Sequence, residues 1–250
     1  MSDSEKPFRQ SHSWDRNFFL GMTALGWLGI LMGFGKDIVD HVTKHRPAYL
    51  LIVHFHAVIF TGWLVLFTAQ ILLIRFKKLS VHKQLGLWMA GLAVVMMIIG
   101  PVTALEVQHH GMNKPGADPA FLSIQLTDIL AFAGFVTAGL AFRKSTAAHK
   151  RLMLMGTLYI TDAGFARWLA GVFLHWLGNG YWPMWVALYG PVNLLILSVG
   201  AYDLVTRRRL HAAVLLGSAW VFANQMTSLT LYFSPGWLVH AKQIIASWPF

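Results

Sequence analysis

YLLIVHFHAVIFTGWLVLFTAQILLI, residues 49–74, contains no Asp, Glu, Lys or Arg along its whole length. A helix needs roughly 20 mainly apolar residues to cross the hydrocarbon core of a bilayer. Residues 49–74 are long enough and apolar enough to do so. They therefore predict a membrane-spanning helix, and the rest of the chain repeats the pattern.

Apolar stretches of this kind dominate the sequence, in which only 12% of residues are charged, about half the usual share in soluble domains. They predict seven spans, at approximately 17–35, 49–74, 83–105, 121–142, 150–177, 182–205 and 212–234. The stretches are too long for barrel strands, so we expect an all-α, polytopic transmembrane helical bundle. Residues 1–250 form one integral membrane domain in this interpretation. A tail at 1–16 precedes the spans, and an apolar tail at 235–250 lies along the interface.

The basic residues indicate the orientation of the bundle. Seven spans place most of the 20 Lys and Arg residues on one side, namely Lys6, Arg9, Arg16, Arg75, Lys77, Lys78, Lys83, Arg143, Lys144, Lys150, Arg151, Arg207, Arg208 and Arg209. The other side receives Lys36, Lys44, Arg46, Lys114 and Lys242. Because basic residues collect in the cytoplasm, we expect a cytoplasmic N-terminus, an external C-terminus and a multi-pass protein of the inner membrane.

This distribution also explains the net charge of +10 without a nucleic-acid partner. The partner that the sequence predicts is the lipid bilayer. The polar start MSDSEK has no signal-peptide pattern, so we expect the first span to direct insertion. The absence of cysteine excludes disulfides, iron–sulfur clusters and covalently attached haem c.

Some polar and small residues within the spans require an explanation. Asp128 and Arg167 lie at similar depths in the fourth and fifth spans, and a charge in lipid is costly unless it is paired. We therefore expect an Asp128–Arg167 ion pair, which either fixes helix register or handles protons or substrate. Gly29 and Gly33 have the GxxxG spacing, which permits a close contact between helices.

The histidines fall into two layers. His82 and His149 begin predicted helices on the cytoplasmic side, whereas His56 lies in the outer half of the second span. Three more histidines lie near the outer surface, His109, His110 and His175. Because imidazole nitrogen is a common ligand of haem iron and of transition metals, both layers are candidate sites.

Two runs share a pattern in which one helix ends at an arginine and the next begins at a histidine. They read His56…Gly62…Leu73-Ile-Arg75…His82…Leu85…Gly100 and Phe132-Ala-Gly134…Gly139…Arg143…His149…Met155-Gly156. This segment resembles transmembrane cytochromes b of the ascorbate-reducible diheme type. The resemblance implies that His82 and His149 bind a cytoplasmic-side haem b and that His56 is one ligand of an outer haem. The fourth span departs from the pattern, with Gln125 and Asp128 where that family has a histidine.

A second resemblance covers a similar set of residues, His56, Gln70, Arg75, His82-Lys-Gln-Leu-Gly86, His149-Lys-Arg-Leu-Met153 and Arg167. This set is similar to a broad group of bacterial multispan membrane proteins of unknown function, in which a histidine followed by a basic residue begins a helix. The resemblance implies a membrane fold and no particular activity.

Three functions therefore stay open. The first is a haem b protein that moves electrons across the membrane or to a quinone or another redox partner. The second is a metal-dependent membrane enzyme or metal-handling protein, in which His109, His110 and His175 hold a divalent transition metal. The third is a transporter or an accessory membrane protein without a cofactor.

Overall fold

The computed structural model describes residues 8–45 and 48–249, and no strand occurs within those ranges. Lys6 and Arg46, which contributed to the predicted orientation, and Phe250 of the predicted tail lie outside the described residues. The elements are α1 (Asp15–Thr43), α2 (Leu51–Arg75), α3 (Leu79–Gly111), the short 3₁₀ helix η1 (Pro119–Phe121), α4 (Leu122–Ala141), α5 (Thr146–Tyr159), α6 (Asp162–Leu177), α7 (Tyr181–Arg207), α8 (Ala212–Tyr232) and α9 (Pro235–Ala246).

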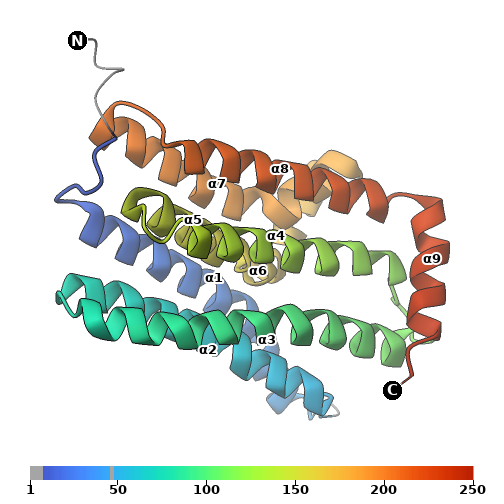
Figure 1. Cartoon of the computed structure of the whole chain (residues 1–250). Helices are drawn as coiled ribbons and strands as arrows, with labels where there is room; N and C mark the ends of the chain where they lie inside the picture. The colour runs from blue at the N-terminus through green and yellow to red at the C-terminus, as the bar shows by residue number, and fades with distance from the viewer. Residues whose placement is uncertain (1–7, 46–47, 250) are drawn as a thin grey trace.

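The long helices run alongside one another, and α9 crosses one end of the bundle (Figure 1). The opposite end carries the turns that follow α2, α4 and α7. We call it the basic end, because these turns hold Arg75, Lys77, Lys78, Arg143, Lys144, Arg207, Arg208 and Arg209. The first described residues of the chain lie at the basic end as well, where Arg75 Nη1 donates to Asn17 Oδ1 (2.8 Å).

Five segments are long and apolar enough to cross a membrane, namely α1, α2, α3, η1 with α4, and α7. The predicted all-helical fold and the membrane-protein class are confirmed at that level. The sequence places two further spans over α5 with α6 and over α8. Of these, α5 and α6 are separate shorter helices, and α8 carries the buried polar residues Asn224, Gln225 and Ser228.

The predicted fifth span, 150–177, is interrupted near its middle, between Tyr159 and Asp162. Thr161 causes the interruption through two short local bonds, because both its backbone N–H (3.0 Å) and its hydroxyl (2.6 Å) donate to the carbonyl of Leu158. A threonine side chain that bonds to the nearby backbone competes with the regular helical pattern. The chain then restarts as α6, and the Asp162 carboxylate accepts from the Ala163 N–H at 2.6 Å.

The close contact expected at Gly29 and Gly33 is made by α1 with α6. A Cβ atom added to Gly164 of α6 would lie 2.6 Å from the carbonyl oxygen of Gly29, and one added to Gly29 would lie 2.5 Å from the ring of Phe165. Only glycines let two helix backbones approach this closely. The α1–α6 contact therefore fixes the position of the second half of the interrupted span.

Most of the apolar tail forms a helix, α9, which packs against the bundle. In α9, Ala241 and Ile245 are fully buried against Ala104 of α3 and Leu122 of α4. Trp237 Nε1 donates to the carbonyl of Ala120 at 3.0 Å. These contacts hold α9 across the ends of α3 and α4.

Candidate functional site

His82 and His149 come together at the basic end, from the first turns of α3 and α5. Their ring centroids lie 6.5 Å apart, and the ring planes are nearly perpendicular, at 85°. Within the described part of the chain, no hydrogen bond joins the two rings. The structure therefore brings these two histidines together from different helices, whereas His109 and His110, whose ring centroids lie 6.0 Å apart, are neighbours in sequence.

The backbone fixes the proton on His149. Its Nδ1 lies 2.7 Å from the carbonyl oxygen of Gly139, which can only accept, so Nδ1 carries the hydrogen. In the neutral ring Nε2 is then left with a free lone pair. A histidine that is held by Nδ1 in this way is the usual form of a histidine that ligates metal through Nε2.

The surroundings of His82 contain two buried polar atoms without a partner. His82 Nδ1 is one of them, and the other is Oε1 of Gln70. The amide nitrogen of Gln70 donates to the backbone carbonyl of His82 at 3.2 Å, so the two residues are in contact. Buried polar groups are nearly always satisfied, so two atoms without a partner among the described residues mark this end of α2 and α3 as a candidate ligand site.

The distance of 6.5 Å between the ring centroids helps to distinguish a direct hydrogen bond between the two imidazoles from a bridging metal atom. A direct N–H···N hydrogen bond would bring the ring centroids to about 5 Å. A metal ion between facing nitrogens gives about 6 Å, since each metal–nitrogen bond is about 2 Å long. The observed centroid separation is longer than that of a direct hydrogen bond and close to that of two imidazoles bound to one metal atom.

A second polar cluster lies further toward the α9 end, where the interruption between α5 and α6 meets α4, α7 and α8. Asp128 Oδ1 accepts from the hydroxyls of Tyr159 (3.2 Å) and Tyr189 (3.4 Å), and Tyr189 also bonds to Ser228 (3.0 Å). The buried carboxyl group of Asp162 at the start of α6 belongs to the same polar cluster, because its charge and that of Asp128 are close enough to interact.

The expected Asp128–Arg167 ion pair is wrong. The hydroxyls of the two tyrosines donate to the carboxyl group of Asp128. No carboxylate of the described residues lies within ion-pair distance of Arg167. Arg167 instead donates from Nη1 to the carbonyl of Ala163 (3.0 Å), and its guanidinium lies 4.4 Å from the centroid of the Phe34 ring. Asp128 and Arg167 lie at similar depths along their helices, but they are not in contact. The interruption after Tyr159 turns α6 toward α1.

His56 lies one turn into α2 and has no histidine partner. Its ring stacks on Phe60, with a centroid distance of 4.0 Å and an interplanar angle of 22°. His56 Nδ1 is buried without a hydrogen-bond partner.

The three histidines predicted to hold a metal do not form such a site. No group of three or more His, Cys, Asp or Glu side chains suited to a metal ion occurs among the residues that the structure describes. His109 donates to the carbonyl of Ile245 at 2.8 Å, and His110 pairs with Glu106 at 3.3 Å. Glu106 also accepts from the indole of Trp248 at 2.8 Å. This segment therefore anchors the α9 region, while His175 packs edge-on against Trp176 in the last turn of α6.

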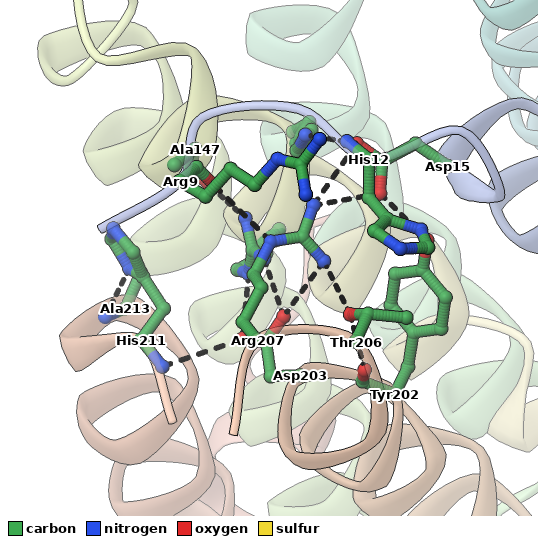
Figure 2. Close-up of polar contacts among 12 residues, drawn as sticks. Arg9, His12, Asp15, Ala147, Tyr202, Asp203, Thr206, Arg207, His211 and Ala213 are labelled. Carbon is green, nitrogen blue, oxygen red and sulfur yellow. Dashed lines mark hydrogen bonds and ion pairs between the residues drawn. The ribbon is translucent and has the colours of Figure 1, made fainter. Parts of the chain in front are cut away.

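Sequence reasoning missed a network of charges that closes the basic end (Figure 2). Asp15 accepts hydrogen bonds from Lys150 (2.8 Å), Tyr202 (2.7 Å) and Arg207 (2.8 Å). Behind it, Arg151 forms a buried ion pair with Asp203. In the sequence, Arg151 and Arg207 served only to predict the orientation of the bundle in the membrane. Asp203, placed four residues before Arg207 at the end of an apolar stretch, was the available signal for a buried pair.

The segment before α1 lies over this network. Gln10 Oε1 accepts from the N–H of Ala147 at 3.0 Å, and the carbonyl of Arg9 accepts from Arg207 at 3.1 Å. Phe8 packs edge-on against His211, with ring centroids 4.7 Å apart. Burial and the positive charge of Arg151 lower the pKa of His211. We call residues 8–14 the N-terminal strap.

Comparison of the chain with protein-family models, curated proteins and solved structures finds no match.

Proposed function

We propose that the protein is a multi-pass membrane protein that binds one haem b between His82 and His149. In this proposal it passes electrons to or from a quinone or another redox partner at the membrane. The observation that carries the proposal is the pair of imidazoles supplied by α3 and α5, whose ring centroids lie 6.5 Å apart.

The residues at the pair fit haem b better than a free metal ion. Two axial histidines are enough for haem, because the porphyrin supplies the other ligands of the iron, whereas a metal ion bound by protein alone usually needs three or four side chains. Gly139 would orient His149 through its Nδ1 hydrogen. Bound haem would supply one-electron redox chemistry, and the helices would exclude water from it.

The described residues offer a pair of histidine ligands for one haem and support no second site. The resemblance to diheme cytochromes implied an outer haem on His56. A partner from α4 would have to come from Gln125 or Asp128. Asp128 is already bound by Tyr159 and Tyr189, and Gln125 accepts from Gln108 at 3.3 Å. The proposal therefore contains a single site at the basic end.

The proposed topology has seven spans, with α5 and α6 together forming the fifth and α8 the seventh. The basic end would face the cytoplasm of a cell with an inner membrane, because positively charged turns stay on that side. The His82–His149 pair would then lie near the cytoplasmic surface. Reporter fusions after residue 78 and after residue 114 test the orientation, since only the second would report an external position.

The experiment that tests haem binding is the visible spectrum of the protein purified in detergent from haem-replete cells. We expect a Soret band and, after reduction with dithionite, sharp α and β bands. His82→Ala and His149→Ala should each abolish them. His240→Ala is the matched control, because His240 Nδ1 also bonds to a backbone carbonyl (Gly236, 2.7 Å) but lies in α9. A colourless wild-type protein that is folded and monodisperse would end the proposal.

A transport function is the second candidate, and the interruption between α5 and α6 favours it. Transporters often place their substrate site where a spanning helix is broken near the middle of the membrane, and here the half-buried Asp128 and the buried Asp162 belong to one polar cluster at such a break. Proton flux into proteoliposomes tests this candidate. A flux that Asp162→Asn abolishes would support transport, and an impermeable wild-type protein would speak against it.

A further inference from the structure

The two histidines of the proposed haem site are supported differently by the helices that precede them. His149 is held through Nδ1 by the backbone carbonyl of Gly139 in α4, ten residues earlier. His82 follows Gln70 of α2 by twelve residues, and there the amide nitrogen Nε2 of Gln70 donates to the backbone carbonyl of His82 at 3.2 Å. Each histidine therefore has a residue of the preceding helix beside it, but only His82 has a side chain in that position.

The amide of Gln70 lies against the first turns of α3. Gln70 is buried, with 7% of its surface exposed. A Cβ atom built on Gly86 would lie 3.5 Å from its Nε2, so the glycine leaves room for the amide. Because residues four apart lie on the same helix face, Gly86 and His82 share the face of α3 that the amide contacts. The amide oxygen is thereby kept close to the His82 residue.

The oxygen of this amide and the nearby ring nitrogen both lack a partner. Gln70 Oε1 and His82 Nδ1 are buried without a hydrogen bond to any described residue. The two atoms are complementary, since an amide oxygen accepts and Nδ1 of a neutral imidazole can donate. A buried polar atom that stays unpaired is costly. The last torsions of a histidine ring and of a glutamine amide are broad, so the two groups can turn toward each other.

We infer that Gln70 is the positioning residue of His82, and that its Oε1 accepts a hydrogen bond from the Nδ1–H of that ring when haem binds. The bond leaves the lone pair of Nε2 to the iron, as the carbonyl of Gly139 does for His149. It also makes the imidazole more basic, and hydrogen bonding of this kind is one means by which a protein sets the reduction potential of haem. The inference rests on the proposed function, because it names the support of one of the two proposed ligands.

The test is a haem titration of the purified haem-free protein, followed by a potentiometric titration of the haem-loaded protein. Gln70→Leu removes the acceptor and nearly keeps the volume of the side chain. We expect haem affinity to fall about 10–100-fold, the usual effect of losing the partner of a ligating histidine. The reduction potential of the haem that stays bound should rise, because a less basic imidazole stabilises oxidised iron less. Gln84→Leu, the same change at an exposed glutamine of α3, is the matched control and should leave both quantities unchanged.

Gln70→Glu separates the acceptor from a structural role. It keeps an oxygen acceptor and removes the amide nitrogen, so it should retain haem with a potential no higher than that of the wild type. A Gln70→Glu variant that matched Gln70→Leu would overturn the inference, because the bond from Nε2 to the His82 carbonyl would then be what matters.

Unchanged affinity and potential in folded Gln70→Leu would also overturn the inference, and would leave the backbone carbonyl of Gln70 as the acceptor for the ring. Haem binding by the wild type would stand in both of these cases. A wild-type protein that binds no haem would instead end the proposed function and this inference together.

Discussion

Arg151 of α5 and Asp203 of α7 form an ion pair whose side chains are 1% and 0% exposed. Both Nε and Nη2 of Arg151 donate to the two carboxylate oxygens of Asp203, and Nη1 donates to the carbonyl of Ala147 (2.7 Å). A paired fork of this kind fixes direction as well as distance. The contact sets the position of α5, and with it that of His149 two residues earlier.

Breaking this pair should destabilise the protein strongly. Asp203→Ala leaves the Arg151 charge buried without its partner, at a cost of about 3–5 kcal/mol. Thermal unfolding in detergent, followed by circular dichroism, measures the effect. The double variant Arg151→Met/Asp203→Leu removes both charges and should be markedly more stable than Asp203→Ala. Equal losses in the two variants would contradict this account.

The contact between α1 and α6 should not tolerate a single methyl group. In Gly164→Ala the new Cβ would lie 2.6 Å from the backbone oxygen of Gly29, and a backbone atom cannot move aside cheaply. We expect a loss of about 1–3 kcal/mol from overpacking. Gly21→Ala in α1 is the control, because nothing lies within 4 Å of its added Cβ. Since alanine is the better helix former, the control should be neutral or stabilising in the same unfolding assay.

The packing of α9 against the bundle should depend on the residues of one helix face. Ile245 is 0% exposed against α3 and α4, whereas its neighbour Ile244 is 41% exposed. Ile245→Ala should therefore cost about 2–4 kcal/mol through the cavity that it leaves. Ile244→Ala should cost clearly less. Faster proteolysis of the C-terminal segment in Ile245→Ala, but not in Ile244→Ala, would report the local loosening of α9.

Acid should weaken the start of α8. His211 Nδ1 accepts from the N–H of Ala213 at 3.0 Å, which requires the neutral ring. Because burial and Arg151 lower the pKa of His211 in the folded protein, its contribution to stability is complete above the unfolded value of about 6.5. That contribution is lost as the pH falls through the lower folded value.

His211→Asn tests this pH dependence, since asparagine also caps helices and does not titrate. Between about pH 7 and pH 5 the melting temperature of the wild type should fall more than that of His211→Asn. Parallel curves for the two proteins would show that another group is responsible.

The helical class and the apolar stretches could be read from the sequence because a bilayer demands long apolar helices. The pairing of His82 with His149 was also accessible, since both begin helices after basic turns on the same predicted side. The interruption at Thr161 was not accessible. A threonine in an apolar stretch more often leaves the helix intact, and here its bonds to Leu158 depend on how α6 packs against Gly29 and Gly33.

The error at Asp128 has a related cause. Depth along a helix follows from residue number, but the direction of a side chain around the axis depends on the neighbouring helices. Nothing in the sequence distinguished Tyr159 and Tyr189 from the apolar residues around them. Their hydroxyls donate to Asp128 because of where the two helices lie in the bundle. His109 and His110 were likewise predicted to be metal ligands, whereas His109 donates to the carbonyl of Ile245 and His110 pairs with Glu106.

The charges around Asp15 have a consequence for the order in which the chain can be completed. Asp15 is made early in synthesis, but it bonds to Tyr202, which follows it by 187 positions, and to Arg207 beyond that. A nascent chain that has not yet reached α7 lacks both partners, and the N-terminal strap then has its contact with Ala147 of α5 but not its contacts with Arg207 and His211. The bundle therefore joins its first segment to its sixth proposed span late, and that joining brings Lys150 and Arg151, beside His149, into their final contacts.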